Sequence, residues 1–298
     1  MSTRALGPGA GWGWLKEGIN LGRHNPRAIF GAVALMALVA LVPSLIQLAL
    51  GQLGLGQQAL LAAMGLTVVL AIVLYPLLIG GVLRVIDASE HGRPTRATAI
   101  FDTFRPGHDA GRLIGFGVLI TAVYIVMFVA VVRLVGKDFF AWYWQMISAA
   151  QSGQTLDPAA MALPDGFGQV MALGSVIALF LGGVYAIGYG QVALAGRGVF
   201  AALGDGVAGT LKNLLPIVLL AVCAFVLMVA LMVAFGLLAG LLALLGTLVH
   251  EMLGLALLIP LYIALLLVLY VVMFGVMYHL WRDVCAGGAP ARDDEVAA

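Results

Sequence analysis

The chain has 298 residues, of which 63% are hydrophobic and only 10% are charged, and its formal net charge is +1. Soluble globular proteins carry about 25% charged residues, so this composition excludes an ordinary soluble protein and indicates an integral membrane protein. We expect its partners to be membrane lipids and a membrane protein, with no nucleic acid.

Six uncharged apolar stretches, taken in chain order, have the roughly 20 residues that a transmembrane helix needs. They lie at 28–50, 59–83, 113–132, 168–195, 214–245 and 253–281. The first 27 residues include five charged ones and lack an apolar core followed by a cleavage site. We therefore expect no removable signal peptide. Residues 1–285 are expected to form a single membrane domain, and residues 286–298 a disordered cytoplasmic tail.

Lysine and arginine are distributed unevenly between the two sides of these spans. Thirteen of the fifteen lie on one side, and only Arg133 and Lys137 lie on the other. Because loops rich in Lys and Arg are retained in the cytoplasm, we predict that both termini are cytoplasmic. The long outer loop, 136–166, holds aromatic residues suited to the lipid headgroup region, which we favour over a ligand cage. They are Phe139, Phe140, Trp142, Tyr143 and Trp144.

A short amphipathic stretch precedes each pair of spans, at 14–26, 94–104 and 199–213. In the second stretch, the apolar residues follow the i, i+3, i+4, i+7 spacing of one helical face, and Pro94 suits a first helical turn. Helices of this kind lie in the headgroup plane with their apolar face toward the lipid.

The three stretches share the pattern apolar, any residue, acid, Gly or Thr, apolar. Its copies are Leu15-Lys16-Glu17-Gly18-Ile19, Ile100-Phe101-Asp102-Thr103-Phe104 and Leu203-Gly204-Asp205-Gly206-Val207. The first and third copies also have an asparagine eight residues after the acid, at Asn25 and Asn213. We therefore predict an all-α polytopic membrane protein with six transmembrane helices in three tandem units, at about 12–84, 94–196 and 197–282. Each unit is an interfacial amphipathic helix followed by a transmembrane hairpin.

This arrangement resembles a set of bacterial inner-membrane proteins related to the six-span membrane domain fused to some glycerophosphodiester phosphodiesterases. The resemblance rests on "WLKEGINLGRHNP" near the start, on "ALGDGVAGTLKN" after the fourth span, and on the alternation of short helices with hairpins. It covers roughly residues 12–282 and implies a helical domain in the cytoplasmic membrane, with no established activity. The phosphodiesterase barrel is absent from this chain, so that activity is not implied.

Residues 84–112 concentrate nine charged residues and two histidines. Topology and anchoring to anionic lipid, at about 1 kcal/mol for each basic residue, account for most of the arginines. The candidates for a lipid-headgroup contact are Arg93, Arg96, Arg105, His91 and His108. The histidines with Asp87 and Asp109 could instead hold a metal ion or act as acid and base, but their spacing matches no such motif. We therefore predict no catalytic, cofactor-binding or metal site, although these four residues have no structural explanation.

The spans themselves contain no Asp, Glu or Lys away from their ends, which disfavours an ion-coupled transporter. A polar cavity among the even-numbered spans is one hypothesis, and close helix packing through the glycines of the fourth span is the other. The residues that would line the cavity are Tyr75, Tyr185, Gln191 and Tyr270. Cys223 and Cys285 lie in different regions and suggest no redox role.

Two functions are left open by the sequence. The first is a non-enzymatic scaffold, regulator, or factor in assembly or envelope organisation, which the lack of a soluble domain and of intramembrane charge favours. The alternative is a carrier or binder of a lipid or small apolar molecule that uses the cavity among the even spans. We expect no enzymatic activity and no cofactor in either case.

Overall fold

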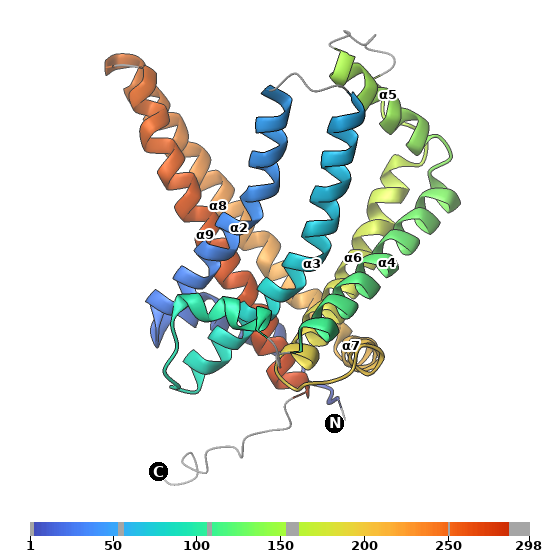
Figure 1. Ribbon diagram of the computed structural model, residues 1–298, viewed down its shortest axis with the longest axis vertical. Helices are drawn as coiled ribbons and strands as arrows, with labels where there is room; N and C mark the ends of the chain where they lie inside the picture. The colour runs from blue at the N-terminus through green and yellow to red at the C-terminus, as the bar shows by residue number, and fades with distance from the viewer. Residues whose placement is uncertain (1–2, 53–56, 106–108, 153–160, 250, 286–298) are drawn as a thin grey trace. The chain divides into compact units, whose positions relative to one another are not determined.

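The computed structural model of the chain describes residues 3–52, 57–105, 109–152, 161–249 and 251–285. Six helices among these residues are long and apolar enough to cross a membrane (Figure 1), which confirms the predicted all-α, six-span architecture. They are α2 (Pro26–Gln52), α3 (Gln57–Glu90), α4 (Ala110–Val135), α6 (Phe167–Ala193), α8 (Leu214–Val249) and α9 (Glu251–Cys285). The tail predicted at 286–298 lies outside the described residues.

Shorter helical elements separate the long ones. They are α1 (Ala10–Asn20) with η1 (Leu21–Arg23), η2 (Ala97–Phe104), α5 (Phe139–Ser152) and α7 (Val199–Lys212). The three predicted amphipathic stretches are thus helical, but η2 is a 3₁₀ helix and begins at Ala97, because Arg96 is extended with φ −139° and ψ 159°. Helix α5 lies where the sequence suggested only an aromatic loop.

The chain divides into two compact units, Met1–Gly117 with Gly183–Ala298 (unit 1) and Val118–Gly182 (unit 2). Unit 2 has its own small core of Val131, Val132 and Val170, which joins α4 to α6. Gly166, with φ +79°, makes the turn into α6, and a Cβ there would lie 1.9 Å from the carbonyl oxygen of Val135. The rings of Phe140, Trp142 and Tyr143 in α5 and of Phe167 in α6 all pack on Phe139.

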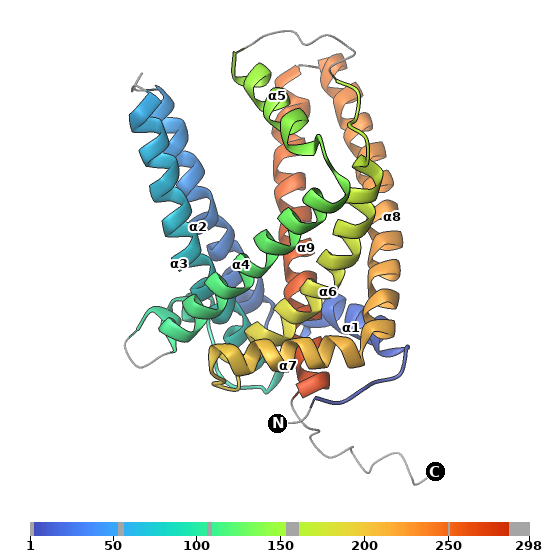
Figure 2. The same ribbon diagram turned by 90° about the vertical axis from the view of Figure 1, so that its right-hand side faces the viewer.

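The short helices of unit 1 gather at one end, where α2, α4 and α8 begin and where α3, α6 and α9 finish (Figures 1 and 2). We call this region the charged end. Large side chains that are fully buried concentrate there, among them Trp14, Phe116, Tyr189, Phe274 and Tyr278. By contrast, only 6% of the most apolar part of α8 is buried, as expected for a helix surrounded by lipid.

Each short helix of the charged end packs on a long helix outside the hairpin that follows it. Helix η2 packs on α2 and α3, and α1 packs on α8 and α9, which are the last hairpin of the chain. Helix α7 crosses the end of α6, where Gly206 meets Val184. Residues from the two ends of the described chain therefore meet, and the charged end closes into a ring.

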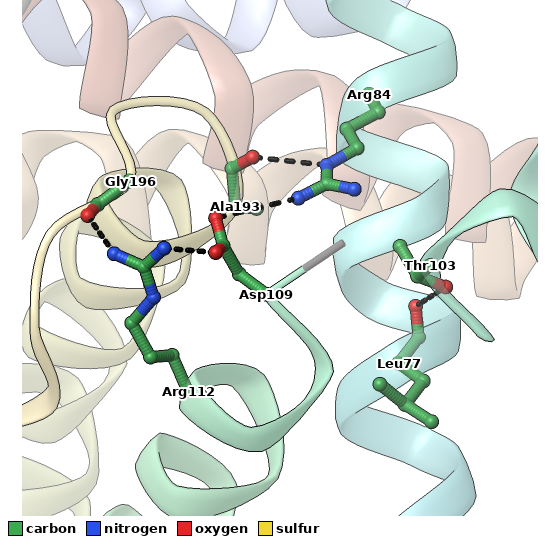
Figure 3. Close-up of polar contacts among 7 residues, drawn as sticks. All are labelled: Leu77, Arg84, Thr103, Asp109, Arg112, Ala193 and Gly196. Atoms are coloured by element: carbon green, nitrogen blue, oxygen red, sulfur yellow. Dashed lines mark hydrogen bonds and ion pairs between the residues drawn. The ribbon is translucent and has the colours of Figure 1, made fainter. Parts of the chain in front are cut away.

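The residue that follows the recurring acid makes a close contact with a long helix in every case. A Cβ on Gly18 would lie 2.8 Å from the carbonyl oxygen of Val272, and one on Gly206 would lie 2.8 Å from that of Val184. The hydroxyl of Thr103 instead donates a hydrogen bond of 3.0 Å to the carbonyl oxygen of Leu77 (Figure 3). The Gly or Thr in the sequence pattern is thus explained by a helix crossing that leaves room only for hydrogen or for a bonded hydroxyl.

A polar side chain at the start of each odd-numbered span holds the segment that leads into another short helix. Asn25 donates to the carbonyl oxygen of Thr95 (3.4 Å), just before η2. Asn213 donates to the carbonyl oxygen of Arg4 (2.9 Å) and accepts from the backbone N–H of Leu6 (2.9 Å), just before α1. At the start of α4, where no asparagine stands, Arg112 donates to the carbonyl oxygen of Gly196, just before α7 (Figure 3).

Candidate functional site

An open pocket of about 700 Å³ lies at the charged end, between the end of α3, the segment leading into η2, η2 itself and the residue preceding α4. We call it the arginine pocket. Its lining residues are Arg84, Val85, Ala88, Pro94, Thr95, Arg96, Ala99, Asp102 and Asp109. It lies wholly within unit 1.

The end of α3 forms one wall of the pocket, and the way this helix ends sets the direction of the segment that follows it. Arg84 and Ala88 lie four residues apart and therefore share a helical face. After Glu90 the backbone N–H of Gly92 bonds Ser89 (3.1 Å) and that of Arg93 bonds Ala88 (2.8 Å), with φ +65° at Gly92. This is a Schellman ending, which turns the chain out of the helix into the extended segment that carries Arg96.

The opposite wall comes from η2 and from the residue before α4. Ala99 and Asp102 are three residues apart, so they lie on one face of a 3₁₀ helix. Asp109 precedes α4, and its carbonyl oxygen accepts the backbone N–H groups of Arg112 and Leu113 (both 3.0 Å). A carboxylate at the start of a helix is favoured by the helix dipole, which explains the acid at this position.

Arg84 is the best-positioned cation of the pocket, because its guanidinium is held from one side only (Figure 3). Its Nε donates to the carbonyl oxygen of Ala193 (3.0 Å), and one terminal nitrogen lies 4.0 Å from the carboxylate of Asp109. The second terminal nitrogen has no hydrogen bond or ion pair with any residue in the described part of the chain. The Arg84 side chain is 24% exposed, so its charge is partly withdrawn from solvent.

The two acids of the pocket are already paired. Asp109 bonds Arg112, and Asp102 lies 3.3 Å from a terminal nitrogen of Arg105. Arg96, by contrast, is exposed and makes no ion pair or side-chain hydrogen bond with any residue that the structure describes. The pocket therefore offers unused guanidinium donors beside neutralised carboxylates.

The residues proposed for a headgroup contact are placed in different surroundings. Arg96 lines the pocket, and Arg105 pairs with Asp102, which also lines it. Arg93 and His91 instead surround the carboxylate of Asp87, to which the hydroxyl of Tyr278 on α9 also donates (3.1 Å). Asp87 therefore has a structural role as a partner of Arg93, His91 and Tyr278, and Asp109 has one at the start of α4. His108 lies outside the described residues.

The four residues proposed to line a cavity among the even-numbered spans have different surroundings. The Tyr185 ring packs on Tyr189, with centroids 4.6 Å apart, and Tyr270 on α9 is 45% exposed. Tyr75 is partly exposed on α3. Gln191 is completely buried and joins α6 to two other helices. Its amide nitrogen donates to Asp205 (2.7 Å), and its amide oxygen accepts from the Trp281 indole (3.3 Å).

Sequence reasoning missed the most important pocket residue, Arg84, which it assigned to membrane topology. The sequence did contain a signal, because Arg84 interrupts an apolar run between Leu83 and Val85. Both neighbours are fully buried in the structure. A charged residue in such a position is expensive unless it has a partner or a function. The pairing of Arg84 with Ala193, 109 positions away, could not be found from local spacing.

A second, smaller groove of about 250 Å³ lies between α1, η1, α2 and α9. Its walls are mostly apolar, with Arg23 and Asn20 as the polar members. None of the four tyrosine and glutamine candidates lines this groove or the arginine pocket. No group of three or more His, Cys, Asp or Glu side chains that could hold a metal ion occurs in the part of the chain that the structure describes.

Comparisons of this chain with models of protein families, with curated proteins and with solved structures find no match. The arginine pocket and the exposed charges of the charged end are therefore the features that bear on function.

Proposed function

We propose that this protein is a non-enzymatic scaffold of the bacterial inner membrane, which presents its charged end to a membrane-protein partner at the cytoplasmic surface. The supporting observation is that the charged residues of this end fall into two groups with different surroundings. One group ties together elements that are distant in the sequence, and the other is exposed and unpaired.

The first group makes the charged end a fixed platform. Lys212 donates to the carbonyl oxygen of Thr3 (2.7 Å), Arg84 donates to that of Ala193 (3.0 Å), and the Trp14 indole donates to Asp283 (3.1 Å). Charge-assisted bonds of this kind are stronger than neutral ones. Because they join α3 to α6, α7 to the N-terminal segment, and α1 to α9, they oppose movement of the hairpins at this end.

The second group supplies the surface for a partner. Lys16, Glu17, Arg23 and Arg27 are exposed on α1, η1 and the first turn of α2. None of them makes an ion pair or a side-chain hydrogen bond with the described residues. Complementary charge on a partner would give such a surface specificity and a fast association rate.

The proposal includes three tandem units related by internal repetition, and membership of the inner-membrane proteins that the sequence resembles. The corresponding contacts of Gly18, Thr103 and Gly206 with the long helices support the repetition. So do the bonds of Asn25 and Asn213 to the segments before η2 and α1.

The experiment that tests the scaffold is gentle extraction from native membranes, with quantification of co-purifying proteins and lipids. We expect a partner in near-stoichiometric amount, at least tenfold less of it with Arg23→Glu and Arg27→Glu combined, and no change with Arg133→Glu and Lys137→Glu combined. The second pair makes the same charge change among exposed residues of unit 2. Equal recovery from both double variants would contradict the proposed surface.

Lipid binding is the second candidate function, and the apolar groove beside Arg23 favours it. Phe30, Val268, Val271 and Val272 supply walls that suit an acyl chain, with the guanidinium available to a headgroup. The same extraction decides between the two functions, because a lipid binder retains a stoichiometric lipid without any protein partner.

The proposed orientation places the charged end in the cytoplasm. In intact cells, a membrane-impermeant maleimide should label Ser148→Cys in α5, whereas Arg27→Cys should be labelled only after permeabilisation. Both positions are exposed. The reverse labelling pattern would overturn the orientation with both termini inside.

A further inference from the structure

We propose that the arginine pocket binds a phosphate monoester or diester group through the guanidiniums of Arg84 and Arg96. The inference rests on the proposed function only in placing the charged end at the level of lipid headgroups. The pocket itself is distinct from the exposed partner surface on α1 and α2.

Arg84 supplies the fixed donor of this site. Its Nε is held by the carbonyl oxygen of Ala193, so the planar guanidinium is oriented before any ligand arrives. The other terminal nitrogen makes no hydrogen bond or ion pair with the residues that the structure describes. The side chain is 24% exposed, and a charge-assisted hydrogen bond is stronger at such a partly desolvated position than at the surface.

Arg96 supplies the second, adjustable donor. It follows Pro94 and Thr95 in the extended segment before η2, and it lines the same pocket as Arg84. Its side chain is exposed and unpaired among the described residues, so binding an anion would not break an existing contact. One fixed and one free guanidinium together match the several acceptor oxygens of a phosphate.

The acids in the lining do not reverse this preference. Asp102 has Arg105 as its partner and Asp109 has Arg112, so each carboxylate is neutralised by its own arginine. Together with Arg84 and Arg96, four guanidiniums stand against two carboxylates, and the local charge is positive. The pocket therefore attracts an anion and not a cation.

The size and depth of the pocket favour a lipid headgroup as the source of the phosphate. A volume of about 700 Å³ falls within the usual range of ligand pockets and accommodates more than a bare phosphate ion. Arg84 lies six residues before the end of α3, which corresponds to about 9 Å along the helix. The phenyl rings of Phe101 and Phe104 on η2 are 37% and 40% exposed, which suits the boundary between headgroups and acyl chains.

The test titrates the full chain, purified in a neutral detergent, with short-chain probes and follows the midpoint of thermal unfolding. The probes are dihexanoyl phosphatidylglycerol, glycerol 3-phosphate, inorganic phosphate and the phosphate-free dihexanoyl glycerol. We expect saturable stabilisation by at least one phosphate ester and none by dihexanoyl glycerol. If phosphatidylglycerol alone binds, the ligand is a lipid headgroup; if glycerol 3-phosphate binds equally well, it is a soluble phosphate ester. Both results support the site.

Variants locate the binding. Arg96→Gln should weaken the affinity about tenfold, which corresponds to the loss of one charge-assisted interaction, without changing the stability of the unliganded protein. Arg84→Lys, which keeps the charge but not the paired donors, should also weaken the affinity about tenfold. Arg27→Gln removes an exposed charge elsewhere at the charged end and should stay within twofold of the wild type.

Three results would overturn the site. They are the absence of phosphate-dependent saturation, wild-type affinity in Arg96→Gln, and an equal loss in Arg27→Gln. Because the titration uses the isolated protein, failure of the pocket is distinguishable from failure of the scaffold, which is measured by recovery of the partner.

Discussion

Replacing Gly11 with alanine should lower the free energy of unfolding by about 3 kcal/mol, one of the two largest effects that we expect from a single substitution. A Cβ on Gly11 would lie 2.1 Å from the carbonyl oxygen of Pro216 and 2.8 Å from the backbone nitrogen of Leu220. Both are backbone atoms of α8, so no side chain can rotate away. Helix α1 would have to move off the last hairpin, and thermal unfolding in detergent measures the loss.

Gly13, two residues along the same helix, provides the matched control. A Cβ there meets nothing within 4 Å. Gly13→Ala should therefore raise the stability by about 0.5 kcal/mol, because alanine loses less backbone entropy on folding than glycine does. Similar midpoints for the two variants would show that α1 does not pack on α8 as described.

Replacing Asn213 with leucine should cost about 3 kcal/mol, although the two side chains have the same branched arrangement of heavy atoms. The Asn213 side chain is completely buried. Its loss would leave the backbone N–H of Leu6 and the carbonyl oxygen of Arg4 without their partner. Both bonds are partly buried, and a polar group left unsatisfied away from water costs about 1–3 kcal/mol. The measurement is again the midpoint of thermal unfolding.

Asn25 is the counterpart of Asn213 at the start of α2, and it should matter less. It is partly exposed and accepts the backbone N–H of Ala28 (3.1 Å) as a helix cap, while its bond to Thr95 is long, at 3.4 Å. Asn25→Leu should cost about 1 kcal/mol, the usual value of an N-cap. A cost equal to that of Asn213→Leu would contradict the special role of Asn213 in closing the ring.

Local pattern was enough to predict the six spans and the three short helices, because apolar length and helical periodicity are local properties. It was not enough to predict their partners. Gly18, Thr103 and Gly206 hold the same place in a short sequence pattern, but the pattern does not show that each one faces a carbonyl group of a distant helix. Such contacts depend on where two backbones cross, which no local spacing encodes.

The candidate site was predicted only in part for the same reason. Arg96 was recognised as a possible headgroup contact because it lies in an obviously polar segment. Arg84 was not, because its role depends on Ala193 and Asp109, which tertiary packing brings to it. The sequence pattern includes Asn25 and Asn213 but not Arg112. The similar contact that Arg112 makes with the segment before α7 depends on tertiary packing.

Residues 3–9, a non-helical segment that leads into α1, close the ring at the charged end. Hydrogen exchange measures this closure without a mutation. The backbone N–H groups of Arg4 and Leu6 bond Val284 (3.1 Å) and Asn213 (2.9 Å). We predict that these two amides exchange at least about 100-fold more slowly than in an unstructured peptide, because exchange requires the ring to open. Exchange at the unstructured rate, with α1 and α9 still protected, would contradict the closed ring.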